Sequence, residues 1–233
     1  MLTNDRFKGL DWVKKKPSDY KPVTVVGVGG IGSWITMLLT KIQSNITIID
    51  DDKVELHNIG GQLLSYKEIG NYKVDAIRSS CLHFNGDYSV KNMITRLNED
   101  NYFRITNSQV VFGCVDNMQT RKFIAKKIQQ GLDVIFIDGR LLAECYQIYV
   151  VTKDNVEEYL NNAIFDDDEV LHTPCSVKQT AHAAAMIASD MIGIYTNILS
   201  NIVNNANIRS IPYYIEYDIP SMIRKTEGKI DII

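Results

Sequence analysis

A glycine-rich turn between an apolar run and an apolar helix constrains the fold of this chain more than any other feature. Residues 23–28 form a short, β-branched and unbroken apolar run, which is typical of a strand buried on both faces. Gly27, Gly29 and Gly32 follow with the spacing GxGxxG, and Gly30 lies between them. Glycines at this spacing allow a tight turn, a close approach of backbone to phosphate and close packing of the next helix. The motif predicts a turn that binds the phosphates of a nucleotide.

The segments after the turn complete a nucleotide-binding unit. Residues 31–43 are predicted to form a helix whose first amide groups and positive dipole end face the phosphate. A second buried strand at residues 45–49 ends at Asp50, about twenty residues beyond the last glycine. A carboxylate at that position accepts hydrogen bonds from a ribose hydroxyl. The unit predicts a bound nucleotide but does not say which one.

The remainder of the chain alternates strand and helix patterns. We expect further strands at residues 88–94, 109–115, 133–138, 144–152 and 212–218, and helices at 72–84, 118–130 and 177–203. This order predicts an α/β fold with a doubly wound, mostly parallel, Rossmann-like sheet and additional C-terminal strands. The expected organisation is an N-terminal arm over residues 1–22, one nucleotide-binding domain over 23–220, and a solvated C-terminal tail over 221–233.

Composition narrows the class of protein. A chain of 233 residues suits one domain with a substantial core. The net charge of −3 offers no basic field, so no nucleic-acid partner is expected. The four cysteines include no CxxC pair, which argues against structural zinc and a disulfide framework and favours a reduced, cytoplasmic setting. The sequence shows no signal peptide and no uncharged apolar run of transmembrane length, so no membrane partner is expected.

Polar motifs beyond the second strand bear on the choice of nucleotide. Residues 49–73 read IDDDKVELHNIGGQLLSYKEIGNYK, and residues 114–121 read CVDNMQTR. The arrangement resembles the ThiF/MoeB/ubiquitin-activating superfamily, with the pattern GxGGxG, DxDxVxxxNxxRQ, GxxK and DNxxxR. The matching positions here are Gly27, Gly29, Gly30 and Gly32; Asp50, Asp52, Val54, Asn58 and Gln62; Gly70 with Lys73; and Asp116, Asn117 and Arg121.

The resemblance implies a reaction and its components. Members of the superfamily adenylate the C-terminal carboxylate of a ubiquitin-like or sulfur-carrier protein, or of a peptide, with ATP and Mg²⁺. It implies that Asp50 binds the ribose, that Asn58, Gln62 and Lys73 hold the phosphates, and that Asp116 binds Mg²⁺ and the reacting phosphate. It also implies a homodimer and an adenylyltransferase activity.

Elementary electrostatics agrees with these implied roles. A carboxylate that attacks a phosphate joins two negative partners, so cations and a metal must neutralise the charge, and Lys73 and Arg121 are expected to supply the cations. Each residue also has a simpler interpretation. Lys73 suits an exposed helix lysine, Asp116 with Asn117 suits a helix cap, and Arg121 suits an ion pair with a nearby carboxylate.

The sequence departs from the family pattern at Gly61, where the family has an arginine that faces the triphosphate. The substitution removes a bidentate phosphate donor. Two arginines are candidates to replace it. Arg140 follows a predicted strand at the correct edge of the sheet, and Arg6 in the N-terminal arm would reach across a dimer. The paired CxxC zinc motif of many bacterial members is absent as well.

Cys175 precedes the helix expected at residues 177–203. In some superfamily members a cysteine in this region accepts the activated carboxylate as a thioester. A thiol near a helix N-terminus has a lowered pKa, which favours that chemistry, whereas packing alone is the simpler role. Cys81, Cys114 and Cys145 are expected to lie in the core.

Two other functions stay open at this point. The first is a catalytically degenerate, nucleotide-binding scaffold that partners an active subunit, which Gly61 favours. The second is an NAD-dependent oxidoreductase, which the glycine motif permits but which has no need for the polar blocks around Asn58, Lys73 and Asp116.

Overall fold

The fold is built on one sheet of eight strands in a computed structural model, which describes residues 9–10, 12, 19–43, 45–85, 90–165, 180–203 and 208–231. The strands are β1 (Val23–Val26), β2 (Ile46–Ile49), β3 (Val90–Met93), β4 (Val110–Gly113), β5 (Ile135–Leu142), β6 (Cys145–Val151), β7 (Tyr214–Asp218) and β8 (Ile223–Glu227). Their order across the sheet is β3-β2-β1-β4-β5-β6-β7-β8.

The sheet divides into a parallel and an antiparallel part. Strands β1 to β5 pair in parallel, and β6, β7 and β8 extend the sheet in antiparallel pairs. The chain runs outward from β1 to β3, then returns to the other side of β1 as β4. The strand order therefore reverses between β1 and β4, and the crevice at their carboxyl ends is where open α/β sheets bind ligands. The prediction of a doubly wound α/β sheet with C-terminal strands is confirmed.

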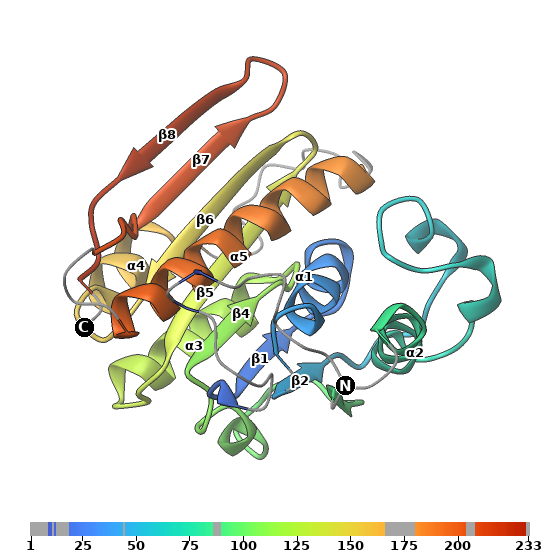
Figure 1. Ribbon diagram of the computed structural model, residues 1–233. Helices are drawn as coiled ribbons and strands as arrows, with labels where there is room; N and C mark the ends of the chain where they lie inside the picture. Colours follow the sequence, from blue (N-terminus) through green and yellow to red (C-terminus); the bar gives the residue numbers. More distant parts are fainter. Residues whose placement is uncertain are drawn as a thin grey trace.

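Helices cover both faces of the sheet (Figure 1). One layer contains α1 (Gly30–Thr40), α2 (Lys73–Asn85) and α5 (Ala181–Val203), and the other contains α3 (Met118–Gln129) and α4 (Val156–Asn162). Short 3₁₀ turns lie at η3 (Leu56–Asn58), η4 (Tyr66–Glu68) and η5 (Tyr102–Arg104). Each face has its own hydrophobic core, with Ile35, Phe112 and Tyr195 in one and Ile124 and Phe136 in the other. All four residues of β1 are buried, as the apolar run predicted.

Three segments differ from the expectations. Strand β5 does not end at Asp138 but continues to Leu142, because seven of its residues, 136–142, pair with β6, and the last four of these lie beyond the parallel part. Helix α4 was not predicted, although Val156 and Tyr159 are spaced for one buried helical face.

The expected C-terminal tail is the third difference. Residues 223–227 form β8, which pairs with β7, and Arg224 forms an ion pair of 2.8 Å with Asp190 of α5. All five side chains of β8 are exposed, so its residues lack the buried alternation that identifies a strand from sequence. Part of the expected N-terminal arm is also packed, because Trp12 and Tyr20 are 6% and 2% exposed.

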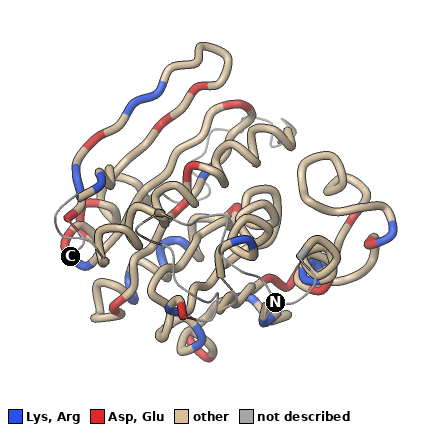
Figure 2. The backbone as a smooth tube through the Cα atoms, viewed as in Figure 1, with Lys and Arg blue, Asp and Glu red and all other residues tan. Residues whose placement is uncertain are grey.

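The distribution of charged residues and the burial of the apolar helix α5 are both consistent with this packing. Figure 2 shows acidic and basic residues interspersed along the backbone. Helix α5 is long and apolar enough to cross a membrane by length and composition alone. However, 56% of its most apolar stretch is buried inside the fold, where Ile187, Ala188 and Tyr195 belong to one of the two hydrophobic cores. A buried core helix accounts for this composition.

Candidate functional site

The glycine turn lies at the carboxyl end of β1, beside the end of β4. Gly27 has φ +84°, and a Cβ there would lie 2.7 Å from the carbonyl oxygen of Cys114. A Cβ at Gly32 would overlap the carbonyl oxygen of Gly27. Both glycines are therefore required by the fold itself, through a left-handed backbone and close packing of α1 on the turn.

Gly29 differs from these two glycines, because a Cβ there would meet only the Gln62 amide nitrogen, at 3.8 Å. It is the N-cap residue of α1, it provides no side-chain cap, and the first turn of the helix contains no acidic residue. The Gln62 side-chain oxygen is also buried without a hydrogen-bond partner among the described residues. The start of α1 thus combines amide donors, a positive dipole end and room for backbone approach, which suits an anion such as phosphate.

Asp50 lies at the carboxyl end of β2, next to this turn. Its two carboxylate oxygens accept hydrogen bonds of 2.8 Å from the backbone amides of Val28 and Asp52. Burial raises its pKa, and those two hydrogen bonds oppose the rise. Each oxygen keeps a lone pair, so the carboxylate is oriented and still able to accept a hydrogen bond from a ligand. Its binding to a ribose stays a prediction.

Lys73 is the first residue of α2 and lies close to the same edge. Its ammonium group contacts the Asp52 carboxylate at 2.7 Å, and its side chain is 10% exposed against 57% for Asp52. The Lys73 backbone amide also donates to the Asp52 carbonyl, at 2.9 Å. Lys73 is therefore a buried, oriented cation rather than the exposed helix lysine of the simpler interpretation.

The loop between β2 and α2 is folded back over the start of α1. Asn58 is 7% exposed, and its side-chain oxygen accepts a hydrogen bond of 2.8 Å from the Glu55 amide. Ser33 of α1 accepts one from the Leu63 amide, at 3.1 Å, and so attaches the segment that contains Gln62 to the helix. Sequence reasoning missed Ser33, although a buried hydroxyl in the first turn of an apolar helix is a detectable signal.

The three consecutive aspartates at the end of β2 form the one described group of His, Cys, Asp or Glu side chains that could hold a metal ion. The carboxylate oxygens of Asp50, Asp51 and Asp52 lie within 4.8 Å of one another. Hard cations such as Mg²⁺ prefer oxygen ligands of this kind.

Asp116 and Asn117 follow β4 at the same edge. The sequence left open whether this pair caps the next helix or binds a ligand. Asn117 is the N-cap of α3, because its side-chain oxygen accepts a 2.9 Å hydrogen bond from the Thr120 amide. Asp116 is exposed, and its carboxylate accepts a hydrogen bond of 3.3 Å from the Asn117 side-chain amide. The cap is therefore Asn117, and the Asp116 carboxylate is available to a ligand.

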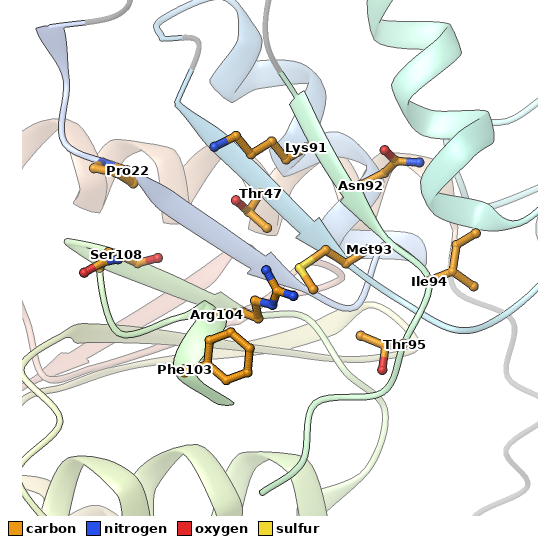
Figure 3. Close-up of a pocket in the computed structure, with 11 residues that line it drawn as sticks. Pro22, Thr47, Lys91, Asn92, Met93, Ile94, Thr95, Phe103, Arg104 and Ser108 are labelled. Atoms are coloured by element: carbon orange, nitrogen blue, oxygen red, sulfur yellow. The ribbon is translucent and has the colours of Figure 1, made fainter. Parts of the chain in front are cut away.

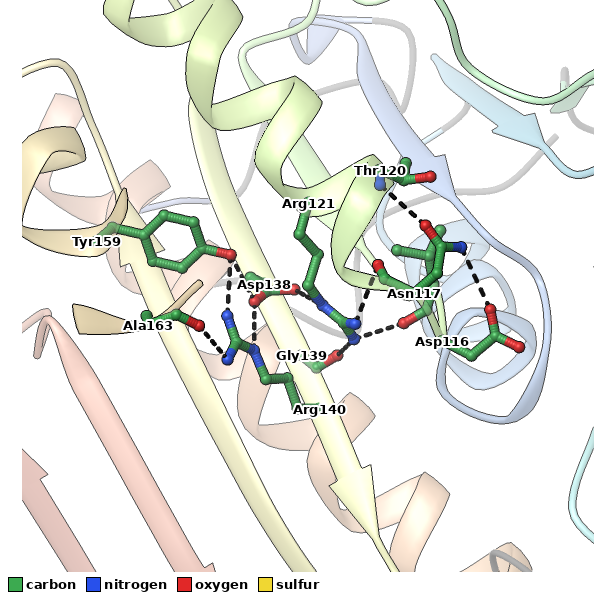
Figure 4. A network of polar contacts seen from close by, with 10 residues as sticks. Asp116, Asn117, Thr120, Arg121, Asp138, Gly139, Arg140, Tyr159 and Ala163 are labelled. Carbon is green, nitrogen blue, oxygen red and sulfur yellow. Dashed lines mark hydrogen bonds and ion pairs between the residues drawn. The ribbon is translucent and has the colours of Figure 1, made fainter. Parts of the chain in front are cut away.

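Arg121 lies in an internal network and not at the open edge (Figure 4). Its side chain is 6% exposed and contacts the Asp138 carboxylate at 2.8 Å. Its other nitrogens donate to the carbonyls of Val115, Asn117 and Gly139. We therefore correct its expected role: in this structure the guanidinium is bound to protein groups, and the simpler ion-pair interpretation describes it.

Asp138 is the centre of this network and was not identified from sequence. It is fully buried, and burial alone would raise its pKa, but the positive charges of Arg121 and Arg140 hold the pKa below its ordinary value. The Tyr159 hydroxyl donates to the same carboxylate, at 2.8 Å. A charged residue directly before a Gly-Arg pair at the end of an apolar strand was the available signal.

Arg140 was proposed to replace the missing family arginine, and its geometry does not support that role. Its nitrogens donate to Asp138 at 2.7 Å, to the Ala163 carbonyl at 2.7 Å and to the Tyr159 hydroxyl at 3.1 Å. All three nitrogens of the guanidinium therefore have protein partners. The second candidate, Arg6, lies outside the described residues.

The described cysteines differ in burial. Cys81 and Cys114 are buried, as expected, and burial raises the pKa of Cys81 to about 12. Cys145 was also expected in the core but is only half-buried, because the buried face of β6 is formed by the alternate residues Tyr146, Ile148 and Val150. Cys175 lies outside the described residues.

A described cleft lies elsewhere. It has a volume of about 690 Å³ and borders β2, β3 and η5, with Thr47, Lys91, Met93 and Arg104 among its lining residues (Figure 3). Neither the glycines of the turn nor Asp50, Lys73 or Asp116 lines it. The candidate site is therefore the polar edge at the ends of β1, β2 and β4, where amides, one buried cation and several carboxylates meet.

Known sequences resemble this chain over part of its length. Ubiquitin-like modifier-activating enzyme 5 of Caenorhabditis elegans is 32% identical over 114 residues, which are 43% of this chain and 27% of that protein. The Drosophila melanogaster enzyme of that name is 33% identical over 119 residues, which are 45% and 30% of the two chains. The chain thus aligns with less than a third of the length of these curated relatives.

Solved structures share the fold at low identity. E. coli MccB, solved with AMPCPP and MccA, has a TM-score of 0.68 and 14% identity over 91% of this chain and 64% of its own. PaaA has a TM-score of 0.66 and 18% identity over 91% and 65%. The model of the family described as the ThiF family matches residues 15–229. With this match and the glycine turn, Asp50, Lys73 and Asp116 at one sheet edge, the chain belongs to the ThiF family.

Proposed function

We propose that the protein uses ATP to adenylate the C-terminal carboxylate of a peptide or a small ubiquitin-like or sulfur-carrier protein. The observation that supports this most directly is the uncapped start of α1 at Gly29, with Asp50, Lys73 and Asp116 at the same sheet edge. Family membership supports it, as do relatives named ubiquitin-like modifier-activating enzyme and a fold shared with MccB, which was solved with ATP and with MccA.

The reaction requires charge neutralisation in a fixed geometry. An oxygen of the acceptor carboxylate bonds to the α-phosphorus of ATP, the bond from that phosphorus to the bridging oxygen breaks, and pyrophosphate leaves. The α1 amides and Lys73 stabilise the phosphate charge, and Asp50 orients the ribose. Dehydrogenase chemistry needs neither a buried lysine nor a free carboxylate at these places.

A magnesium ion fits the donor set of this edge. Asp116 has an exposed carboxylate, and Asp50, Asp51 and Asp52 provide oxygens within 4.8 Å of one another. Mg²⁺ prefers carboxylate and phosphate oxygens, and when bound it neutralises phosphate charge. The cation of Lys73 is held by Asp52, so Asp116 is the carboxylate that we propose for the metal.

A second candidate function is a degenerate nucleotide-binding scaffold. Gly61 replaces the family arginine, and Arg140 is occupied by Asp138, Tyr159 and Ala163. Arg140 therefore does not compensate for it in this structure. This candidate predicts nucleotide binding without turnover.

Ligand-dependent unfolding followed by isotope exchange separates these functions. ATP·Mg²⁺ at about 100 times its dissociation constant should add about 2.7 kcal/mol of stability, and NAD should add none. Exchange of labelled pyrophosphate into ATP, dependent on an added C-terminal peptide or carrier protein and absent in Asp116→Ala, is the expected result. Binding without exchange would favour the scaffold, and stabilisation by NAD alone would overturn both.

We also propose that Cys175 accepts the activated carboxylate as a thioester. In that step the thiolate sulfur bonds to the acyl carbon and AMP leaves. The wild type should form an adduct that a reducing thiol cleaves, and Cys175→Ala should keep pyrophosphate exchange but form no adduct. An adduct that persists in Cys175→Ala would exclude this cysteine.

A further inference from the structure

One fully buried carboxylate and two arginines form a network directly beside the candidate site (Figure 4). Arg121 of α3 contacts one oxygen of Asp138 at 2.8 Å, and Arg140 of β5 contacts the other at 2.7 Å. The side chains of the two arginines are 6% and 12% exposed. The network has two arms, one through each arginine, and each arm attaches a different part of the chain to Asp138 of β5.

The arm formed by Arg121 reaches the backbone on both sides of Asp116. Its guanidinium donates to the carbonyl of Val115, which precedes Asp116, and to that of Asn117, which follows it, at 3.3 Å in the second case. It also donates to the Gly139 carbonyl, at 3.3 Å. Arg121 thereby binds the loop after β4 to Asp138 and Gly139 of β5.

Asp116 has little support of its own. Its side chain is exposed, and the Asn117 amide that contacts it, at 3.3 Å, belongs to the same loop. The hydrogen bond from Thr120 to Asn117 fixes the start of α3 but does not extend to Val115. The position of the Asp116 carboxylate therefore depends on the carbonyls that Arg121 holds.

The planarity of the guanidinium explains why an arginine is suited to this place. It presents five N–H donors in a fixed fork, so that one side chain contacts a carboxylate and several carbonyls at once. A lysine would retain the charge but would not reproduce that set of directions. Asp138 orients the fork because it accepts from Nε and is itself immobile in the sheet.

We propose that Arg121, oriented by Asp138, is a positioning residue that holds the backbone around Asp116 and thereby places its carboxylate for the metal and phosphate. The expected effect on ATP binding rests on the proposed function. The expected effect of Arg121 on the loop backbone is independent of it. Arg121 reaches the nucleotide only through the loop and touches none of the reacting groups.

Arg140 provides a matched control. It contacts the same carboxylate, but its other donors bind Ala163 and Tyr159 of the α4 region and not the loop after β4. Arg121→Lys and Arg140→Lys both keep a positive charge beside Asp138. Only Arg121→Lys removes the contacts to the Asp116 loop.

Hydrogen exchange without ligand tests the backbone part of the proposal. The amides of Cys114 and Thr120 flank the loop and donate to the Val26 carbonyl and to the Asn117 side-chain oxygen. They should exchange at least about tenfold faster in Arg121→Lys than in wild type, whereas Arg140→Lys should change them less than twofold. Amides in β1 should keep the same protection in both variants. Equal acceleration in both variants, or none in Arg121→Lys, would overturn the proposal.

Magnesium dependence of ATP affinity tests the consequence. The factor by which Mg²⁺ improves ATP affinity should be abolished in Asp116→Ala, reduced about tenfold in Arg121→Lys and nearly unchanged in Arg140→Lys, because groups behind a metal ligand typically contribute 10–100-fold. A reduction of the same size in both arginine variants would show a structural role only. If wild type binds no ATP, the proposed function fails, and the exchange experiment alone decides the backbone part.

A variant without buried charge guards against a failure of Arg121→Lys to fold. The triple substitution Arg121→Met, Asp138→Leu and Arg140→Met removes both arms together, a change that leaves such proteins stable in many cases. It should fold, but the amides of Cys114 and Thr120 should exchange rapidly. Wild-type protection at these amides would overturn the proposal.

Discussion

Two groups of charged residues at the sheet differ in how fully their hydrogen-bonding groups are paired within the protein. Around the glycine turn, Asp50 accepts only two backbone amides, and Lys73 has one partly exposed carboxylate partner. Within β5, Asp138 is fully buried and saturated by Arg121, Arg140 and Tyr159. The first group retains unused hydrogen-bonding capacity, and the second has little left.

The difference separates ligand binding from fold stability. A group that keeps free lone pairs or a free charge in a crevice is able to bind a ligand, whereas a satisfied buried pair mainly specifies the protein's own geometry. Substitutions should therefore fall into two classes: those at Asp138 should change stability first, and those at Gly29 or Lys73 should change nucleotide affinity first. Four experiments test this separation.

The largest expected effect on stability belongs to Asp138→Leu. It leaves Arg121 and Arg140 as uncompensated buried cations, and removing one partner of a buried pair costs about 3–5 kcal/mol. For a chain of this size, chemical denaturation should show a much lower midpoint with a similar slope. A loss below about 1 kcal/mol would mean that the two guanidinium groups find other partners or water.

Low pH should cause part of the loss of stability expected for Asp138→Leu, because it protonates the Asp138 carboxylate. The pKa of Asp138 is lowered in the fold, so its ionised form contributes stability above the ordinary value of about 3.9, and this contribution disappears as the pH falls through the lowered pKa. Asp50 has the opposite sign, because its raised pKa makes the folded state bind a proton more tightly.

Unfolding free energies measured between about pH 2 and 6 should show both effects. Asp138→Asn should flatten the decline in stability at the acid end. Asp50→Asn should steepen the decline, because it removes a group that favours the folded state as the pH falls. The same change of slope in both variants would contradict the contrast between the two regions.

Gly32→Ala and Gly29→Ala form a matched pair of intermediate size. The added methyl at position 32 overlaps the Gly27 carbonyl, so the turn must move, and such overpacking costs about 1–3 kcal/mol. The methyl at position 29 has no neighbour closer than 3.8 Å, so stability should change little while ATP affinity falls. Thermal unfolding with and without ATP·Mg²⁺ measures both, and unchanged affinity in Gly29→Ala would argue against phosphate binding there.

Lys73→Met should have the smallest effect on stability. The ion pair with Asp52 is partly solvated, and pairs of this kind contribute about 0.2–1 kcal/mol. The loss of the phosphate-binding cation should nevertheless remove most of the stabilisation by ATP·Mg²⁺. Lys53→Met provides the control, since Lys53 is exposed and lies over the ring of Tyr72. Equal ATP responses in the two variants would exclude Lys73 from the site.

Much of this architecture was predictable because its signals are local. The apolar runs at β1, β2 and β4, the glycine spacing and the periodicity of α3 each depend on residues within one segment. The family motifs then placed Asp50, Lys73 and Asp116 together, since parallel strands end at one edge. Strand β8 and helix α4 were missed because their environment and not their own pattern stabilises them.

The sequence by itself determined the strand, glycine turn and helix at the start of the sheet, the α/β fold class and membership of the ThiF family. Only the tertiary structure decided which polar residues remain available. Arg121 and Arg140 looked like phosphate ligands until Asp138 was found buried between them, and Asp116 was separated from its neighbour only when Asn117 proved to be the cap. The physical reason is that a charge buried without partners is costly, so the fold assigns partners across segments that no local pattern connects.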